Sequence, residues 1–465
     1  MIRVTVGDIV KAASGRLLSG SPDTVLEHIS IDSRKMEGND LFVPFKGEHF
    51  DAHDFIGKAF AAGAAASLST REDVETGGGA VILIRDTLTA LQDIGRWYRS
   101  ERLRGFPIIG VTGSVGKTST REMIQTTLSA GFSVFSTKGN FNGQIGVPLT
   151  LSQMDPDRDQ IAVLEMGMSL PGEMERIART ACVDCAVMTN IGVSHIENLG
   201  SQANICAEKL HIIDGMKDGG LLILNGDDPI LSEIRLDRDI RIAYYGTSEK
   251  CRYRILDIRT VDNKTVFDFT IDGKTYTLRM NVPGAHHVRN AMAALAVAVE
   301  YGVDINAAIQ KVEAFAGFSR RMEVSRCGDM IFIDDAYNAS PDSMRAAISV
   351  LDTMQTRGRK IAVLADMLEL GEKSPEYHFE VGLYAVDKRV DCYVFIGDLS
   401  WWIGRAVDQY TDLPNQYFRT NEEAASWLIS HVRPDDIILF KGSNGMHLNE
   451  VIAALRNAVE KQQAE

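Results

Sequence analysis

A glycine-rich segment in the first third of the chain has the spacing of a phosphate-binding loop. It reads Gly-Val-Thr-Gly-Ser-Val-Gly-Lys-Thr-Ser over residues 110–119, continues an apolar run that begins at Ile108, and precedes a segment with helical periodicity. Glycines let successive backbone N–H groups curl around phosphate oxygens, and a helix N-terminus adds partial positive charge. In this pattern Lys117 neutralises the outer phosphates and the Thr118 hydroxyl can ligate Mg²⁺, although a glycine turn that binds nothing is the alternative. The predicted phosphate-binding residues are Gly113, Ser114, Val115, Gly116, Lys117, Thr118 and Ser119.

Two side chains at the ends of predicted strands could organise a metal ion beside this loop. Glu165 ends the apolar run 161–164, and His195 lies in the loop that follows the apolar run 186–188. An open parallel sheet binds its ligands at the carboxyl ends of its strands, so both side chains would face the phosphates. The competing interpretations are a surface acid and a structural histidine.

Lys209 lies within the apolar stripe of a helix predicted over residues 201–216. A lysine at such a position must extend to solvent, pair with an acid or lose its charge. Burial favours the neutral amine, which can add CO₂ to form a carbamate, an anion able to hold a second Mg²⁺. Periodicity alone favours a side chain that extends to solvent.

Other candidate residues carry weaker signals when each is taken alone. Cys182 and Cys185 could suit a metal or redox site, but no second cysteine pair is near, and packed free thiols fit better. Asn290 precedes an alanine-rich helix, and an Asn amide suits recognition of adenine, whereas Arg321 could simply be solvated. Residues 334–341, Asp-Asp-Ala-Tyr-Asn-Ala-Ser-Pro, place acids, an amide and a proline turn at a strand end, which favours a ligand-binding edge.

Short apolar runs separated by helical segments must position these residues, and they predict an α/β fold with a doubly wound parallel sheet. Several such runs lie between residues 108 and 224, a β-hairpin is expected to turn at Asp272-Gly273, and further runs begin at residue 330. We predict a small α/β N-terminal domain, a central P-loop domain with a hairpin extension, and a C-terminal Rossmann-like domain. Their predicted ranges are 1–85, 86–316 and 317–465.

The composition of the chain excludes several classes of protein. A chain of 465 residues needs more than one core, and 45% hydrophobic with 24% charged residues exclude a largely disordered chain. A net charge of −14 argues against a general nucleic-acid or anionic-membrane binder. No apolar run approaches the roughly 18 residues of a membrane span, and residues 1–10 lack the apolar core of a signal peptide. We expect a cytoplasmic monomer without nucleic-acid or membrane partners.

Taken together and in order along nearly the whole chain, these motifs resemble the Mur ligase family, the ATP-dependent amide-forming enzymes of peptidoglycan assembly. The segment 334–341 is the most specific to one branch of that family, the branch that adds D-alanyl-D-alanine. Besides this segment and the phosphate-binding loop, the resemblance rests on Asp32-Ser33-Arg34, residues 40–43, 46–55 and 137–150, Asn190–Gly192, His195–Glu197, residues 366–371 and His378.

The resemblance implies an ATP- and Mg²⁺-dependent ligase that joins D-alanyl-D-alanine to UDP-N-acetylmuramoyl-tripeptide through an acyl phosphate, releasing ADP and phosphate. It also implies that the N-terminal domain holds the UDP end of the substrate, and that the C-terminal domain brings in the amine and closes over the site. Lys209 matches the carbamylated lysine of the family. The implied roles are substrate binding by Ser33, Arg34, Asn140 and Asn142, catalysis by Lys117, Glu165, His195 and Lys209, metal binding by Thr118, Glu165, His195 and Lys209, and nucleotide base and ribose contacts by Asn290, Arg321 and Asp335.

Three positions depart from the family pattern. His211 replaces the acid usual two places after the modified lysine, Gly143 replaces an Asn, and Asn444 replaces an Arg.

The nearest alternative function is that of the preceding ligase, which adds a diamino acid to the dipeptide, but its usual Asp-Asn-Pro-Arg motif does not occur in the sequence. Another is a non-catalytic nucleotide-binding relative, which would be expected to lose the catalytic candidates. Whether the third peptide residue is diaminopimelate or lysine stays open.

Overall fold

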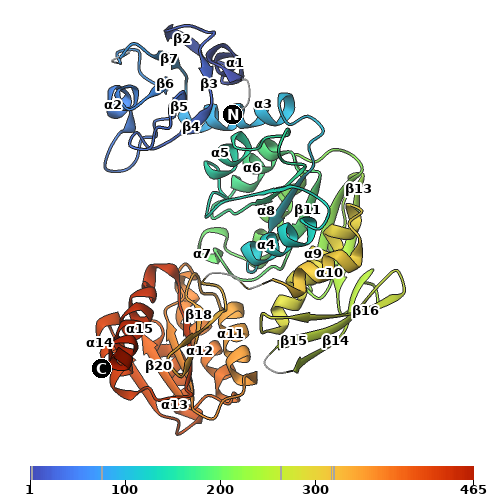
Figure 1. Ribbon diagram of the computed structural model, residues 1–465, viewed down its shortest axis with the longest axis vertical. Coiled ribbons are helices and arrows are strands. Elements are labelled where there is room, and N and C mark those ends of the chain that lie inside the picture. The colour runs from blue at the N-terminus through green and yellow to red at the C-terminus, as the bar shows by residue number, and fades with distance from the viewer. Residues whose placement is uncertain (2–3, 75–76, 262–263, 316, 318–319, 465) are drawn as a thin grey trace.

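The described residues of the computed structural model form three α/β units that follow one another along the chain (Figure 1). The N-terminal unit lies at the top of the view, the central unit in the middle and the C-terminal unit at the lower left. The predicted α/β class is confirmed, and within the described residues no helix is long and apolar enough to cross a membrane. Residue 316, at the predicted boundary between the second and third domains, lies outside the described residues. The structure describes residues 1, 4–74, 77–261, 264–315, 317 and 320–464.

The N-terminal unit is a small sheet with short helices packed against it. Its elements are β1 (Val4–Thr5), α1 (Val6–Ala12), β2 (Arg16–Ser19), β3 (Val25–Leu26), β4 (His28–Ser30), β5 (Asp40–Phe42), η1 (Ala52–Phe55), α2 (Ile56–Ala61), β6 (Ala64–Ser69) and β7 (Ala80–Leu83). The strand order is β2-β7-β6-β5-β4, with β2 antiparallel to β7, and β1 pairs separately with β3. Thr5 and Asp8 exchange side-chain and backbone hydrogen bonds, a capping box that begins α1.

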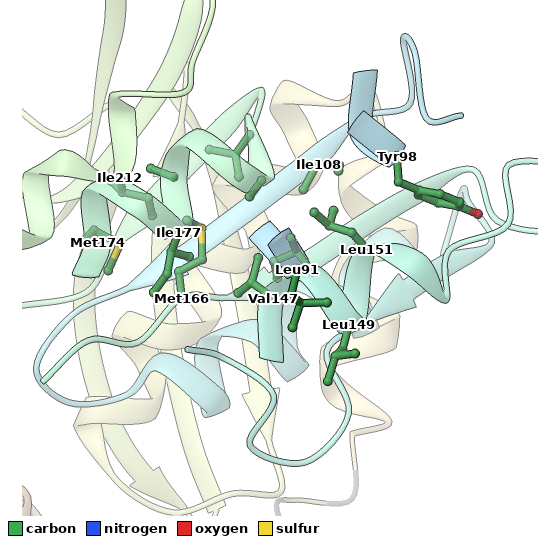
Figure 2. Packing of buried hydrophobic residues seen from close by; sticks show 14 of the residues in the cluster. Leu91, Tyr98, Ile108, Val147, Leu149, Leu151, Met166, Met174, Ile177 and Ile212 are labelled. Atoms are coloured by element: carbon green, nitrogen blue, oxygen red, sulfur yellow. The ribbon is translucent and has the colours of Figure 1, made fainter. Parts of the chain in front are cut away.

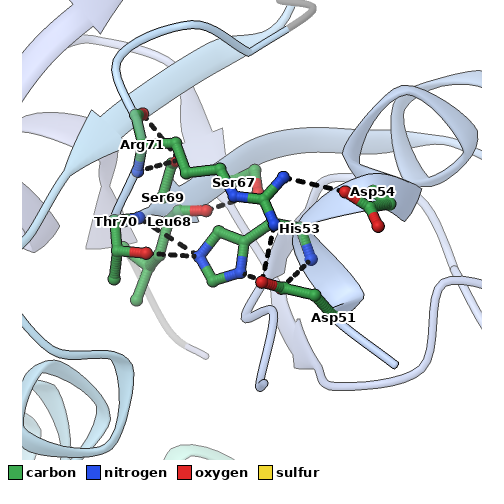
Figure 3. A network of polar contacts seen from close by, with 8 residues as sticks. All are labelled: Asp51, His53, Asp54, Ser67, Leu68, Ser69, Thr70 and Arg71. Carbon is green, nitrogen blue, oxygen red and sulfur yellow. Dashed lines mark hydrogen bonds and ion pairs between the residues drawn. The ribbon is translucent and has the colours of Figure 1, made fainter. Parts of the chain in front are cut away.

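A hydrogen-bonded network around His53 joins η1 to the segment after β6 (Figure 3). His53 Nδ1 lies 2.6 Å from Asp51 Oδ1, and the backbone N–H of Thr70 donates to His53 Nε2 at 3.2 Å. Because Nε2 accepts that bond, Nδ1 is the ring nitrogen that can donate to Asp51. Arg71 donates to Asp51 and Asp54. Burial acts to raise the pKa of Asp51, but the hydrogen bonds from His53 and Arg71 outweigh it and lower that pKa to about 2.

The central unit is built on a large, mostly parallel sheet. Its elements are α3 (Thr87–Glu101), β8 (Ile108–Thr112), α4 (Lys117–Leu128), β9 (Val134–Ser136), α5 (Gly146–Ser152), β10 (Ile161–Glu165), α6 (Glu173–Ala181), β11 (Cys185–Met188), α7 (Ile196–Leu199), α8 (Gln202–Leu210), η2 (His211–Ile213), β12 (Gly220–Asn225), η3 (Leu231–Glu233), β13 (Ile240–Gly246), β14 (Tyr253–Val261), β15 (Lys264–Ile271), β16 (Lys274–Met280), α9 (Ala285–Glu300) and α10 (Ile305–Glu313). The strand order is β16-β15-β14-β13-β12-β11-β8-β10-β9. Pairing is parallel from β9 through β14 and antiparallel for β15 and β16.

Alternating residues of the central strands enter two different cores, as both faces of this sheet are covered. Ile108 of β8 packs with α3, α5 and α6, whereas Ile109 packs on the opposite face with α4 and α9. On α3, Leu91 and Tyr98 are fully buried against α5 and α6 (Figure 2). The same core contains buried residues of the N-terminal unit, which ties that unit to the central one. The predicted hairpin is confirmed: Asp272 and Gly273 form its turn with φ of +49° and +78°.

The C-terminal unit is a second doubly wound sheet. Its elements are β17 (Glu323–Cys327), β18 (Met330–Asp335), α11 (Pro341–Thr353), β19 (Lys360–Ala365), η4 (Gly371–Lys373), α12 (Ser374–Val386), β20 (Cys392–Ile396), α13 (Trp401–Tyr410), β21 (Asn415–Phe418), α14 (Asn421–His431), β22 (Ile437–Lys441), η5 (Asn444–Met446) and α15 (Asn449–Ala464). The order is β17-β18-β22-β19-β20-β21, in which β17 is antiparallel to β18 and the other pairs are parallel. Helices α11 to α13 pack on one face, and α14 and α15 on the other.

Candidate active site

The carboxyl ends of neighbouring central strands bring the predicted residues together. The sheet order places β8 between β10 and β11, with β12 next to β11. The loop after β8, Glu165 at the end of β10, the segment 189–195 after β11 and the segment 225–228 after β12 therefore share one edge of the sheet. This is the edge at which open α/β sheets bind their ligands.

The P-loop is held in shape by the segment that follows β11. Asn190 Oδ1 accepts a hydrogen bond from the Val115 N–H at 3.0 Å, and the hydroxyl of Thr189 donates to the Val115 carbonyl at 2.6 Å. Gly113 has a φ of +147°, and a Cβ there would lie 1.9 Å from Thr189 Oγ1, so this position requires glycine. Gly116, with φ of +84°, leads directly into α4. These contacts hold the loop backbone in place at a helix N-terminus, an arrangement that suits phosphate.

Lys117 lies in the first turn of α4 with its side chain folded back over the loop. Its Nζ donates to the carbonyls of Gly113 at 2.8 Å and Ser114 at 3.4 Å. Burial lowers the pKa of Lys117; the negative charge of Glu165 acts against this shift, and Arg321 adds to it. The ammonium group therefore donates to backbone carbonyls, and phosphate oxygens could take the place of these carbonyls as acceptors.

Glu165 is a nearly fully buried carboxylate at the centre of a polar cluster. Its Oε2 accepts from the Thr118 hydroxyl at 2.7 Å, and its Oε1 accepts from Asn142 Nδ2 at 2.8 Å. Arg121 Nε lies 3.9 Å from Oε2, and the Glu165 N–H donates to the hydroxyl of Thr137. These contacts fix two predicted metal ligands, Thr118 and Glu165, beside each other.

Lys209 is fully buried on α8, so the expectation from periodicity that it extends to solvent is wrong. Its Nζ has no hydrogen-bond partner among the described residues. Burial is the main cause that lowers the pKa of Lys209 well below its usual value, and the nearby charge of Lys117 lowers it further, whereas Glu208 acts to raise it. The Glu208 carboxylate is occupied by the N–H groups of Gly172 and Met174, both at 2.9 Å. The structure therefore holds a buried amine whose neutral form is favoured.

The predicted helix over residues 201–216 is shorter than expected. It ends at Leu210, and the chain continues as the tighter turn η2. His211 lies in this turn, and its Nδ1 is 2.8 Å from Asp214 Oδ2. His211, one of the three residues that depart from the family pattern, is thus paired with an acid of its own turn. The thiols of Cys182 and Cys185 are free, as predicted, and Cys185 is buried.

His195 faces the C-terminal unit. Its Nδ1 lies 2.9 Å from Oε2 of Glu369, in the loop after β19. The adjoining Gly192 is also close to this unit, because a Cβ there would lie 2.7 Å from Asp342 Oδ2 at the start of α11. The segment after β11 therefore contacts the P-loop on one side and the C-terminal unit on the other.

The remaining predicted nucleotide-binding residues lie around the opening of the P-loop. Asn290 Oδ1, on α9, accepts from the Thr120 hydroxyl at 3.2 Å. The guanidinium of Arg321 lies 3.9 Å from the ring centroid of Tyr337, a cation–π contact. Asp335 Oδ2 lies 2.8 Å from Nζ of Lys441. The structure therefore places Arg321 and Asp335 on the C-terminal side, across from Asn290.

A cavity of about 970 Å³ between the central and C-terminal units gathers most of the predicted site. Ser33 and Arg34 are outside its lining: they follow β4 in the N-terminal unit, where Arg34 pairs with Asp32 at 2.9 Å. Gly113 and Lys209 are likewise not among the residues that line the cavity. Gly143 and Asn444, which depart from the family pattern, line the cavity. The predicted residues in the lining are Ser114, Val115, Gly116, Lys117, Thr118, Ser119, Asn140, Asn142, Glu165, His195, Asn290, Arg321 and Asp335.

The residues present fit a divalent cation and a modified lysine. The Thr118 hydroxyl and the Glu165 carboxylate are oxygen donors of the kind that Mg²⁺ prefers. The unpartnered Nζ of Lys209 is a buried polar atom that a carbamate would convert into a pair of oxygen ligands. Within the described residues, no group of three or more His, Cys, Asp or Glu side chains could hold a metal by itself. Mg²⁺ commonly binds to one or two carboxylates together with substrate phosphates.

Several residues at the cavity were not predicted. Asp227 Oδ2 accepts from Arg289 Nε at 3.1 Å, and both side chains line the cavity beside Asn290. Asp227 follows the apolar run 221–224, so the strand-end argument used for Glu165 could have found it. Glu369 follows a strand of the C-terminal unit in the same way. No local sequence pattern indicated that Glu369 lies close to His195.

Family models match three successive parts of the chain. A model described as the Mur ligase family, catalytic domain, matches residues 25–99, and one described as the Mur ligase middle domain matches residues 111–298. A third, described as the Mur ligase, glutamate ligase domain, matches residues 320–444.

Individual relatives match over the full length. The UDP-N-acetylmuramoyl-tripeptide–D-alanyl-D-alanine ligase of Bacillus subtilis strain 168 is 38% identical, over 98% of this chain and 99% of its own. The enzyme of the same name from Escherichia coli K12 is 29% identical over the same shares. Among solved structures, MurF from Acinetobacter baumannii has a TM-score of 0.89 at 28% identity, covering 98% of this chain and 99% of its own. MurF from Thermotoga maritima in complex with ADP has a TM-score of 0.84 at 28% identity, covering 95% and 100%.

A P-loop cavity between a parallel-sheet unit and a Rossmann-like unit defines a nucleotide-dependent enzyme. The full-length likeness to the B. subtilis enzyme and the three successive family matches make the class more specific. The chain belongs to the Mur ligase family and is an ATP-dependent ligase.

Proposed function

We propose that this chain joins D-alanyl-D-alanine to UDP-N-acetylmuramoyl-tripeptide, converting ATP to ADP and phosphate in a step of peptidoglycan precursor synthesis. The observation that carries the proposal is the cavity in which Lys117, Glu165 and His195 meet the wall formed by Arg321 and Asp335. Relatives named for this reaction match the chain over its full length. We place the reaction in the cytoplasm, where ATP is supplied.

The chemistry starts from a difficulty: a carboxylate at neutral pH is a poor electrophile for an amine. Transfer of the γ-phosphoryl group to the terminal carboxylate of the tripeptide makes an acyl phosphate, whose phosphate can leave. The amine nitrogen of D-alanyl-D-alanine then attacks the acyl carbon. A C–N bond forms, the C–O bond to phosphate breaks, and the amine loses a proton.

We assign the phosphate contacts to the P-loop. Its backbone N–H groups and Lys117 bind the β- and γ-phosphates, and Lys117 exchanges its contacts with the carbonyls of Gly113 and Ser114 for phosphate oxygens. Because the loop is already shaped by Thr189 and Asn190, little reorganisation accompanies binding. Positioning and electrostatic stabilisation are therefore the main contributions of these residues.

We assign the cation ligands to Thr118, Glu165, His195 and carbamylated Lys209. Bound Mg²⁺ would supply charge neutralisation for the transferring phosphoryl group. Asn142 orients Glu165 through its 2.8 Å hydrogen bond, and with Asn140 it borders the space for the tripeptide. The neutral amine of Lys209, favoured by burial, is the form that reacts with CO₂.

We assign the adenine and ribose to Asn290, Arg321 and Asp335, since these three surround the cavity next to the P-loop. The UDP end of the substrate goes to the N-terminal unit, with Ser33 and Arg34 as contacts. This division corresponds to functional domains at residues 1–85, 86–316 and 317–465. Closure of the C-terminal unit over the cavity would protect the acyl phosphate from water.

The test is phosphate release from ATP with UDP-N-acetylmuramoyl-tripeptide, measured with and without D-alanyl-D-alanine. We expect release that depends on both substrates, together with a pentapeptide product identified by mass. Tripeptides that end in diaminopimelate and in lysine are compared in parallel.

Two outcomes would contradict the proposal. Reaction of the dipeptide substrate with a free diamino acid, without reaction of the tripeptide, would assign the chain to the preceding step. No release with any substrate pair would favour a non-catalytic relative.

A further inference from the structure

A carboxylate of the C-terminal unit contacts a predicted metal ligand of the central unit. Glu369 Oε2 lies 2.9 Å from His195 Nδ1, an ion-pair distance at which the angle is not that of a hydrogen bond; the imidazole is 19% exposed, whereas the Glu369 side chain is 62% exposed. Glu369 therefore reaches from the cavity rim to a largely buried ring. Both residues line the cavity that contains the P-loop.

The backbone on each side of this contact is held in an uncommon conformation. His195 has a φ of +64° and Glu369 a φ of +62°, the left-handed region that side chains other than glycine rarely adopt. His195 is the N-cap residue of α7, and η4, which begins two residues after Glu369, packs against α7. A Cβ at Gly371 would lie 3.4 Å from Glu197 Cβ. The two loops therefore pack against each other. Strained backbone positions of this kind persist where the surrounding structure holds them in place.

A carboxylate on one imidazole nitrogen determines what the other nitrogen can do. Neutral histidine carries one proton, and an acceptor at Nδ1 keeps the proton there and leaves the lone pair of Nε2 free. Histidines that ligate metals commonly hold such a partner, which fixes the tautomer and the ring orientation.

We propose that Glu369 is a positioning residue that fixes His195 in the Nδ1–H tautomer and thereby presents Nε2 to the divalent cation. The inference rests on the proposed function in one respect, the assignment of His195 as a metal ligand. Because Glu369 belongs to the C-terminal unit, the metal site is complete only when this unit is seated as observed. The contact thus couples the arrangement of the two units to cation affinity.

The first measurement is Mn²⁺ binding to the full-length chain with a non-hydrolysable ATP analogue, followed by the EPR signal of free Mn²⁺. We expect Glu369→Ala to weaken binding on the order of 10- to 100-fold, the usual cost of losing such a partner. Glu369→Gln should keep part of the affinity, because its amide oxygen can also face Nδ1 as an acceptor. Glu372→Ala, at an exposed acid of η4, is the charge-matched control and should bind as the wild type does.

The second measurement is the tautomer of His195, from ¹⁵N shifts of histidine-labelled protein assigned with His195→Asn. We expect the Nδ1–H tautomer in the wild type and in Glu369→Gln, and a shift toward Nε2–H in Glu369→Ala. An unchanged tautomer or an unchanged Mn²⁺ affinity in Glu369→Ala would overturn the inference. Equal, complete loss of binding in Glu369→Gln and Glu369→Ala would also overturn it, because it would make Glu369 a direct ligand.

The His195→Asn variant separates this inference from the metal assignment beneath it. Lost Mn²⁺ binding in His195→Asn with intact binding in Glu369→Ala would overturn the positioning role alone. Intact binding in His195→Asn would overturn both, since His195 would then not be a ligand.

Discussion

The hydroxyl of Thr118 donates a 2.7 Å hydrogen bond to Oε2 of Glu165, joining the first turn of the P-loop helix to the end of the neighbouring strand β10. The contact gathers two oxygen atoms of the kind that Mg²⁺ prefers before any nucleotide is bound. Glu165 is otherwise held by Asn142, so its carboxylate has little freedom to turn away. The proposed cation site is thus largely preorganised by the central unit.

Glu165→Gln tests the charge at this position, because the amide keeps the shape of the side chain and removes the negative charge. We expect phosphate release to fall by about 100-fold or more and the Mg²⁺ concentration for half-maximal rate to rise, as a metal ligand and its charge are lost. Initial rates over a Mg²⁺ series measure both. Glu122→Gln, on the neighbouring helix α4 and paired with Arg121, should leave the Mg²⁺ dependence unchanged. A normal Mg²⁺ dependence in Glu165→Gln would contradict the assignment.

Lys117→Ala should abolish ATP turnover while the fold is kept. Under the proposed function the ammonium group binds the outer phosphates, and we expect a loss of at least about 100-fold in phosphate release. Thermal unfolding should change little, because the hydrogen bonds of the Lys117 ammonium group go to two carbonyls of its own loop. Lys311→Ala, at an exposed lysine of α10, is the matched control. Near-normal turnover in Lys117→Ala would show that the P-loop assignment is wrong.

The local parts of this site could be predicted from the sequence because short segments determine them. The glycine spacing of residues 113–119 follows a strand and begins a helix, and β8, the P-loop and α4 have that order. Glu165 was found because strand ends share an edge of a parallel sheet. The turn at Asp272-Gly273 was predictable because few residue pairs adopt positive φ at both positions.

The parts that could not be predicted depend on contacts between distant segments. Periodicity placed Lys209 on an apolar stripe but could not show that the packed chain buries its side chain fully, so the solvent-directed interpretation is wrong. The pairs His195 with Glu369 and Asp335 with Lys441 arise only once separate segments are packed in three dimensions. No local pattern encodes such pairs, because the residues of each pair lie far apart in the sequence.

Lys209→Ala should be inactive and partly restored by short-chain carboxylates. The buried amine is held near its neutral form, and removal of the side chain would leave space in which a carboxylate can stand in for a carbamate. Phosphate release is measured with added acetate or propionate, and with chloride at equal ionic strength as the control. Lys209→Arg, which cannot be carbamylated, should be inactive with every salt. Full activity of Lys209→Ala without added carboxylate would remove Lys209 from the site.

Asp51 provides a prediction for the pH dependence of stability. Its pKa is lowered to about 2 from an ordinary 3.8, so the folded state favours the ionised carboxylate, held by His53 and Arg71. The resulting stability is fully present above about pH 4 and is lost as the pH falls toward 2, because the protonated acid loses these bonds. Asp51→Asn should therefore lower the free energy of unfolding near pH 7 by about 1 kcal/mol, after allowance for solvent screening.

Urea unfolding of the wild type and of Asp51→Asn measures this difference, from near neutral pH down to the lowest pH at which the wild type still unfolds cooperatively. The difference should narrow as the pH falls below about 4. Asp54→Asn is the matched control: Asp54 also pairs with Arg71 but is 63% exposed, so its loss should cost less. A destabilisation of Asp51→Asn that stays constant across the whole pH range would mean that packing of the side chain, and not its charge, stabilises the network around His53.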